Sequence, residues 1–361
     1  MSEANTLGGV GAIAPELLRY RDVSDALVEA AVMAAGDDER LPEVNGLVIR
    51  RMKLEAPGGP GEALQIRPVP YGPDGLAAGY QLLDNVILAG LRLRRGAEDD
   101  AYPPEVARLI GHDADSAAPF ALLEPYRGRP IGEHAGNLLL SDRRRFQVSL
   151  LTSVRLLGAA GIAHRGLSPS TVRWDGDRVQ ITGFAHTTVL GAPRTVVGTP
   201  PWCAPEQRSG YAEGDVTDRD DIWAAGRLIY YVVTGEQLTG RAELADNTEL
   251  AGLLAGIFGP PEERPSAAEL LARIGATDPV RHGADGSPAL DRGREEFHAA
   301  RYRKHPETSP KDDEDEEEVA PTRPEAHRPV VVLRSFPRYL APALLVLAGV
   351  AVAALILLIA R

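Results

Sequence analysis

The residue types that most often bind metals or perform redox chemistry are sparse in this chain of 361 residues. Cys203 is the single cysteine, so no intramolecular disulfide and no cysteine-rich zinc site can form. The eight histidines lack the spacing of metal ligands. Two glycine-rich runs are poor phosphate cradles: residues 58–61 contain a proline and suit a hairpin turn, and residues 8–11 precede no recognisable pair of strands. The residue types alone therefore indicate neither a metal centre nor a redox site.

The composition and the charge limit the class of protein. Hydrophobic residues make up 44% of the chain and charged residues 25%, which is typical of a folded protein with one large or two modest domains. The net charge of −12 argues against nucleic acid as a main partner, because phosphate binding needs a concentrated basic surface. Residues 311–318 carry seven acids and one base, a run that favours solvated chain over packed surface.

The middle of the chain contains the elements that would position polar side chains. Apolar residues recur at three- and four-residue spacing from Asp142 to Gly158, which predicts an amphipathic helix that ends at Gly161. A polar loop, residues 164–171, follows this helix. Residues 172–174 and 179–182 then predict a short hairpin around the turn Asp175-Gly176.

Residues 164–171 read His-Arg-Gly-Leu-Ser-Pro-Ser-Thr, which resembles the catalytic loop of protein kinases, with its pattern H-R-D-L-K-P-E-N. Residues 183–185, Gly-Phe-Ala, stand where that family has D-F-G. Residues 198–207, 220–235 and 263–271 are similar, in the same order, to the end of the activation segment, the next long helix and a later R-P-S-A segment. The chain thus resembles bacterial Ser/Thr protein kinases. The resemblance implies an α+β, bilobal protein-kinase-like fold with a reduced β-rich N-lobe and a helical C-lobe.

Upstream, the resemblance places a nucleotide cleft on four residues. Residues 120–128 are similar to the strand and hinge between the lobes, which puts Glu124 and Tyr126 at the cleft. Residues 62–67 can be aligned with the strand that carries the V-A-I-K motif, so that Arg67 replaces the lysine and Gln65 lies above adenine. Residues 76–93 would form the regulatory helix, with Asp84 in place of its glutamate.

The same alignment implies that the catalytic groups are missing. Phosphoryl transfer needs a base, two metal ligands and a cation on the phosphates. At those positions of the loop and of D-F-G this chain has Gly166 for the base, Ser168 for the lysine, Thr171 for the asparagine and Gly183 for the aspartate. We therefore expect no kinase activity, no bound Mg²⁺ and no required cofactor, while metal-free binding of ATP stays open.

The residues that hold the family's fold are present. The resemblance implies that His164 and Phe184 stack in an internal column, beside Arg165 of the loop. Glu206 and Arg264 would form a buried ion pair, and Asp221 would brace the catalytic-loop backbone. An intact scaffold without its chemistry favours a pseudokinase.

The C-terminal part of the chain predicts a membrane anchor. Residues 340–360 are uncharged and long enough, as a helix, to span a bilayer. Arginines precede this span and only Arg361 follows it, which favours a cytoplasmic N-terminal side. Gly349 and Ala353 are spaced so that two helices could pack, which leaves dimerisation open. No secretory signal is recognisable in the first thirty residues.

These observations predict five regions. They are a partly disordered N-terminal segment (1–42), an N-lobe (43–124), a C-lobe (125–280), a disordered acidic and proline-rich tether (281–338) and a single transmembrane helix (339–361). Thr195 in the activation segment and Thr308 beside the acidic tract are candidate phosphoacceptors.

The sequence predicts a single-pass pseudokinase of a bacterial inner membrane, with its kinase-like domain in the cytoplasm. Its expected partners are proteins, including active Ser/Thr kinases or phosphothreonine-reading proteins, for which it would be a scaffold or an allosteric regulator. Three alternatives remain: an atypical active kinase, a nucleotide sensor without catalysis, and a passive anchor whose domain only docks another protein.

Overall fold

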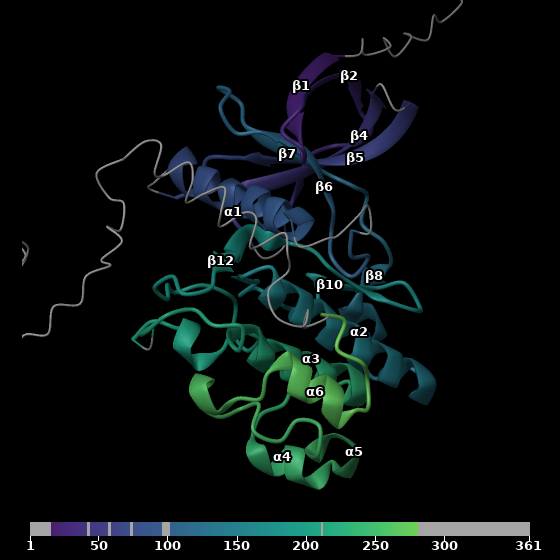
Figure 1. The fold of residues 1–361 in the computed structure, drawn as a ribbon, viewed down its shortest axis with the longest axis vertical. Coiled ribbons are helices and arrows are strands. Elements are labelled where there is room, and N and C mark those ends of the chain that lie inside the picture. Colours follow the sequence, from purple (N-terminus) through teal and green to yellow (C-terminus); the bar gives the residue numbers. More distant parts are fainter. Residues whose placement is uncertain are drawn as a thin grey trace, which may run out of the picture. The chain divides into compact units, whose positions relative to one another are not determined.

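The computed structural model describes residues 16–41, 44–56, 59–72, 75–95, 102–210 and 212–280. A β-rich region comes first and a helical region follows, as Figure 1 shows from its violet strands to its green helices. The predicted α+β class, with strands before helices, is confirmed at this level. Within these residues no helix has both the length and the apolar character needed to cross a membrane. The predicted tether, the predicted membrane helix and Thr308 lie outside the described residues.

The N-terminal region is built from antiparallel strands that close on themselves. They are β1 (Glu16–Asp22), β2 (Leu27–Ala34), β3 (Glu39–Arg40), β4 (Leu47–Ala56), β5 (Gly59–Pro68), β6 (Leu109–Asp113) and β7 (Phe120–Leu123). Their order is β2-β1-β6-β7-β5-β4-β3, and a further pairing of β2 with β4 completes the ring. Its interior holds a core of its own: Tyr20, Ala30, Val32, Met52, Leu54, Ala63, Phe120 and Leu122. Closure leaves few strand edges open to pairing with other chains.

The strands β1 and β2 correct the predicted start of the N-lobe. The sequence boundary at residue 43 left them in a partly disordered segment, but both are full partners in the ring. Only Tyr20, Ala30 and Val32 are buried in these two strands. Their half-exposed residues blur the alternation of apolar and polar positions that would have shown them as strands.

The helix α1 (Leu76–Arg95) confirms the prediction of a helix over residues 76–93. It packs against the ring through one apolar face that includes Leu83, Val86, Ile87 and Leu93. These residues recur at helical spacing, which is why the sequence revealed the helix.

The C-terminal region surrounds two long helices, α2 (Leu140–Ala159) and α3 (Asp220–Thr234). One short strand, β8 (Arg129–Pro130), precedes α2, and four lie between the two helices: β9 (Ile162–Ala163), β10 (Val172–Trp174), β11 (Val179–Ile181) and β12 (Thr188–Val189). The predicted hairpin is present as β10 paired with β11. The helices α4 (Arg241–Asp246), α5 (Thr248–Ala251) and α6 (Ala267–Arg273) complete the region. Single turns of 3-10 helix lie at η1 (Ile131–His134), η2 (Phe184–His186), η3 (Pro205–Gln207) and η4 (Pro261–Glu263).

The helix α3 is the centre of the C-terminal core. Apolar side chains lie on nearly all of its faces, so it is buried by neighbours all round. It begins with Asp220 and Asp221, both buried, and it ends at Gly235, which adopts the left-handed conformation with φ of 80°. The two carboxylates at its start therefore reach the polar loop from inside the core.

Candidate functional site

The loop at residues 164–171 is held by the first turn of α3. The carboxylate of Asp221 accepts hydrogen bonds from the backbone N–H of His164 (2.6 Å) and of Arg165 (2.7 Å). Arg165 has a φ of 60°, an unfavourable conformation for a residue with a side chain. The two hydrogen bonds to the carboxylate stabilise this strained backbone conformation.

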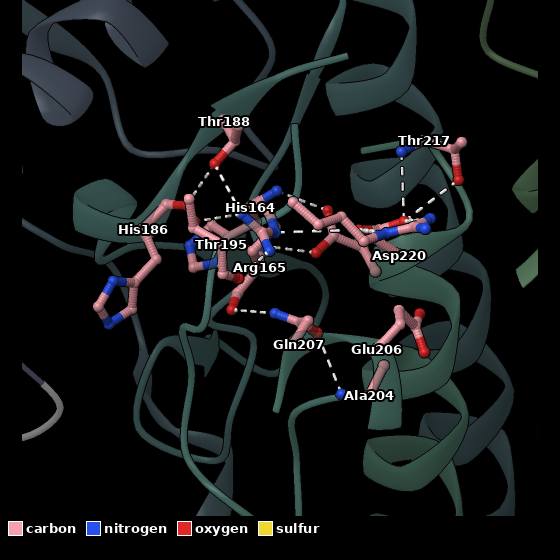
Figure 2. Close-up of polar contacts among 12 residues, drawn as sticks. His164, Arg165, His186, Thr188, Thr195, Ala204, Glu206, Gln207, Thr217 and Asp220 are labelled. Carbon is pink, nitrogen blue, oxygen red and sulfur yellow. Dashed lines mark hydrogen bonds and ion pairs between the residues drawn. The ribbon is translucent and has the colours of Figure 1, made fainter. Parts of the chain in front are cut away.

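The side chain of Arg165 connects the loop to the activation segment (Figure 2). It donates from Nη1 to the hydroxyl of Thr195 (3.1 Å) and from Nη2 to the Thr195 carbonyl (2.7 Å). Its Nε lies 3.8 Å from Asp220, and Arg194 donates to the same carboxylate at 2.9 Å. Gln207 donates to the carbonyl of Arg165 (2.8 Å). Two arginines thus share one buried carboxylate, and Arg165 anchors Thr195 through its hydroxyl and its carbonyl.

His164 is neutral in this arrangement. Its Nε2–H donates to the carbonyl of Thr182 (2.9 Å), and its Nδ1 accepts from the backbone N–H of Gly166 (3.2 Å). Burial lowers the pKa of His164 to about 4. Its ring lies 5.1 Å from that of Phe184, and the two ring planes are tilted by 60°, so the side chains that the kinase resemblance pairs are in contact but not stacked.

At the positions that correspond to catalytic groups, the side-chain hydroxyls make their contacts within the loop. Thr171 donates from Oγ1 to the carbonyl of Gly166 (3.0 Å) and accepts at Oγ1 from the backbone N–H of Ser168 (2.9 Å). The hydroxyl of Ser168 lies 3.0 Å from that of Ser170. These groups stabilise the loop, and none of them presents a carboxylate or an ammonium group to a phosphate.

The residues present do not fit the Mg²⁺ that the kinase resemblance implies. Gly183 has no ligand atom and adopts the left-handed conformation (φ 76°). A Cβ atom at this position would lie 2.7 Å from Cγ2 of Thr171, whose rotamer the loop hydrogen bonds fix. A Cβ atom at Gly166 would lie 3.2 Å from the ring of His186. Only about 10 Å³ of open space remains beside Gly166, barely enough for one water molecule.

A larger cavity, of about 320 Å³, lies between the strands and the helical region. Three arginines line it: Arg40 of β3, Arg51 of β4 and Arg173 of β10. Arg173 lies over the ring of Tyr126 at 5.8 Å and donates to the backbone carbonyls of Arg127 and Gly128. Burial raises the pKa of Tyr126, whose hydroxyl has no hydrogen-bond partner among the described residues. We call this cavity the cleft.

The cleft corrects the alignment of β5. Leu64 lines the cleft, whereas Gln65 and Arg67 lie on the opposite face of the strand. Arg67 forms an ion pair with Asp38 (2.7 Å), which Arg50 of the neighbouring strand also contacts. A shift of one residue turns every side chain of a strand to the other face. Gln65 and Arg67 are therefore not cleft residues, and the cations at the cleft come from other strands.

Two further predicted positions also lie away from the cleft. Asp84 is exposed on α1. Its neighbour Asn85 contacts the loop after Gly183, because its side chain donates to the carbonyl of Ala185 (2.7 Å). Glu124 is exposed and lies 3.4 Å from Arg108. Four residues were predicted to line the nucleotide cleft. Of these four, only Tyr126 lines the cleft.

The ion pair between Glu206 and Arg264 is buried in the helical region. Arg264 donates from Nη1 and Nη2 to the two carboxylate oxygens at 2.5 and 2.8 Å. Its guanidinium also lies over the ring of Trp223 at 5.2 Å. Breaking such a pair leaves a buried charge uncompensated, which typically costs about 3–5 kcal/mol.

Several residues that shape the site were missed from the sequence. Asp220, Arg194 and Gln207 fix the activation segment, and Arg51 and Arg173 line the cleft. Only Arg173 carried a signal, because it lies between the buried residues of β10 and so had to point to the other face.

Comparison with known proteins supports a protein-kinase-like domain. The chain is 32% identical over 177 residues to the serine/threonine-protein kinase Pkn1 of Myxococcus xanthus, which covers 42% of this chain and 24% of that protein. It is 27% identical over 201 residues to the probable serine/threonine-protein kinase PkwA of Thermomonospora curvata, covering 49% of this chain and 26% of that protein. It is 30% identical over 156 residues to the inactive serine/threonine-protein kinase PLK5 of mouse, covering 41% of this chain and 24% of that protein.

No family model matches the chain. In each of these three relatives the similarity spans about a quarter of the protein's own length. The similarity therefore concerns a kinase-like domain and leaves the other functions of those proteins aside.

Proposed function

We propose that this chain is a pseudokinase, a kinase-like domain without phosphoryl transfer that acts in phosphorylation signalling by binding protein partners. The observation that carries the proposal is the set of hydrogen bonds within the loop at residues 164–171. The hydroxyl of Thr171, at a metal-ligand position of the family, is engaged within the loop. Gly183, at the other ligand position, has neither a ligand atom nor room for a Cβ atom.

The scaffold supports a function that depends on shape. Buried ion pairs join Asp220 to Arg165 and Arg194, and Glu206 to Arg264. They connect the activation segment to α3 and join η3 to the segment before α6. A surface that is already ordered loses little conformational entropy on binding, which favours docking of a partner.

The partners and the location follow from the sequence as further parts of this proposal. Active Ser/Thr kinases and phosphothreonine-reading proteins are the partner classes that a kinase-like shape favours. Residues 340–360 would hold the chain in a bacterial inner membrane with this domain in the cytoplasm. Membrane fractionation of the full chain and of a chain that ends at residue 338 tests the anchor, because only the full chain should sediment with membranes.

A phosphotransfer assay tests the loss of catalysis. The full chain should transfer no phosphate from ATP to itself or to a basic protein with either Mg²⁺ or Mn²⁺. The Gly166→Asp variant should also be inactive, because the metal ligands are still absent. Transfer by the unmodified chain would overturn the proposal, and transfer by the single variant would show that the residue roles are wrongly assigned.

The cleft favours a second candidate function, metal-independent sensing of a nucleotide. Arg40, Arg51 and Arg173 could neutralise phosphates where the family uses a metal. A ligand at one hundred times its dissociation constant stabilises the folded state by about 2.7 kcal/mol, which a thermal unfolding curve resolves. Stabilisation by ATP without Mg²⁺, lost in Arg51→Gln, would support the sensor. Stabilisation that requires Mg²⁺ would contradict both candidate functions.

A further inference from the structure

A second cavity lies in the helical region, beneath the end of η3. It encloses about 270 Å³ between Arg208, two residues of α3 (Trp223 and Arg227), Leu238 and Phe258. None of these residues belongs to the cleft or to the loop at 164–171. We call it the basic cavity.

Three hydrogen-bond donors of the basic cavity are unsatisfied. The Nε atoms of Arg208 and Arg227 and the Nε1 atom of Trp223 are buried and have no acceptor among the described residues. Buried N–H groups in folded proteins nearly always have a partner, because leaving one unpaired is unfavourable. Three such donors around one cavity therefore point to an acceptor that the described residues do not supply.

The charge of the basic cavity is also uncompensated. Arg208 donates from Nη2 to the carbonyl of Cys203 (3.1 Å), and Arg227 donates from Nη2 to the carbonyl of Leu238 (2.5 Å). These contacts orient both guanidinium groups but supply no negative charge. Among the described residues that line the cavity none is acidic, and the nearby carboxylate of Glu206 is fully paired with Arg264. Burial and the adjacent charge of Arg208 lower the pKa of Arg227, as expected for two cations that face each other.

We propose that the basic cavity is a binding site for a phosphate monoester. A phosphate monoester carries nearly two negative charges and three acceptor oxygens, which matches two guanidinium groups and three free donors. A carboxylate has one charge and would leave one arginine uncompensated. The cavity can hold the phosphate group and a short side chain, and Leu238 and Phe258 provide an apolar wall. The proposal does not depend on whether the kinase-like cleft is catalytic.

Three ligands distinguish the sources of such a group. Isothermal titration of the full chain would use inorganic phosphate, a blocked phosphothreonine amino acid and the same compound without its phosphate. We expect the phosphothreonine compound to bind and the unphosphorylated compound not to bind. Binding of inorganic phosphate alone would assign the site to a free anion, still a phosphate site. Equal binding of acetate at matched ionic strength would overturn the proposal.

Variants place the binding at this cavity. Arg208→Met should weaken phosphate-monoester binding at least tenfold while leaving the thermal midpoint unchanged or raised, because it relieves the repulsion with Arg227. A purely structural arginine would lower the midpoint instead. Trp223→Phe removes one donor and keeps an aromatic ring, and it should weaken binding as well. Arg178→Gln, at an exposed arginine elsewhere in the domain, is the matched control and should bind like the unmodified chain. Unchanged affinity in both cavity variants would overturn the assignment.

Discussion

At the scale of single residues, hydrogen bonds replace charges in the loop that joins α2 to the hairpin. Thr171 donates from Oγ1 to the carbonyl of Gly166 and accepts from the backbone N–H of Ser168. Its hydroxyl thus stabilises the present loop conformation, and these hydrogen bonds would have to break before Thr171 could bind a metal ion. Gly183 fits beside it because it has no side chain. A side chain at Gly183 would therefore conflict with the packing of Thr171.

Gly183→Asp should destabilise the fold by about 1–3 kcal/mol, since its Cβ atom would overlap the methyl group of Thr171 and the backbone is left-handed. Thr171→Ser removes that methyl group and keeps the hydroxyl. In this background the cost of Gly183→Asp should be smaller, and chemical denaturation of the four chains of this double-mutant cycle measures the difference. Equal costs in both backgrounds would mean that the methyl contact is not the cause.

The buried imidazole of His164 gives a prediction for pH. Its folded-state pKa of about 4 lies below the value of about 6.5 for an unfolded histidine. Between these values only the unfolded chain takes up the proton, so this residue lowers the free energy of unfolding by up to about 3 kcal/mol as the pH falls from 6.5 to 4. Asp221 acts in the opposite sense, because burial raises its pKa to about 6 and the folded chain is protonated first.

The two opposing effects make a direct titration of His164 the better measurement. The NMR shift of its ring proton should stay constant from pH 8 to about pH 5 and change only near pH 4. A midpoint near 6.5 would contradict the hydrogen bonds that keep this ring neutral.

At the scale of elements, the long helices and the strands β5 and β7 were predictable from the sequence, whereas β1 and β2 and the facing of the side chains of β5 were not. The helix over residues 76–95 has one buried face, and its spacing shows in the sequence. Residues 63–66 of β5 are all buried, because one face lies inside the ring and the other faces the cleft or α1. Because the polar Gln65 is buried on one face and the apolar Leu64 on the other, residue polarity does not show which face of the strand lines the cleft. The alignment of Gln65 and Arg67 with the cleft failed for this reason.

The contact between β1 and β6 within the ring gives a prediction at the same scale. Gly111 of β6 lies against Tyr20 of β1, where a Cβ atom would approach the tyrosine ring to 2.4 Å. Gly111→Ala should therefore destabilise the fold by about 1–3 kcal/mol through overpacking. Gly61→Ala is the matched control, since its Cβ atom would meet nothing within 4 Å. Denaturant unfolding of both variants measures the effect, and equal stabilities would contradict the close packing of β1 against β6.

At the scale of the whole domain, the resemblance to kinases described the helical half better than the strand-rich half. Contacts are made by His164, Asp221, Glu206 and Arg264 with the partners that the motifs implied. These motifs consist largely of buried side chains, each of which needs a specific partner. For the arginines that line the cleft, the sequence carried a signal only at Arg173 of β10 and none at Arg40 of β3 or Arg51 of β4. Those positions depend on how separate strands pair, which a single sequence does not specify.

Asp220 joins these parts, because its buried carboxylate compensates Arg165 of the loop and Arg194 of the activation segment. Asp220→Asn would leave two cations in the core with less negative charge, and we expect the domain to lose about 3–5 kcal/mol of stability. Because Arg194 would then be released, trypsin should cut after it faster than in the unmodified chain. Asp218→Asn, at an exposed aspartate two residues away, should change neither the stability nor the cleavage rate. If Asp220→Asn is cut at the rate of this control, the activation segment is held by other contacts, and its order would not depend on the carboxylate at the start of α3.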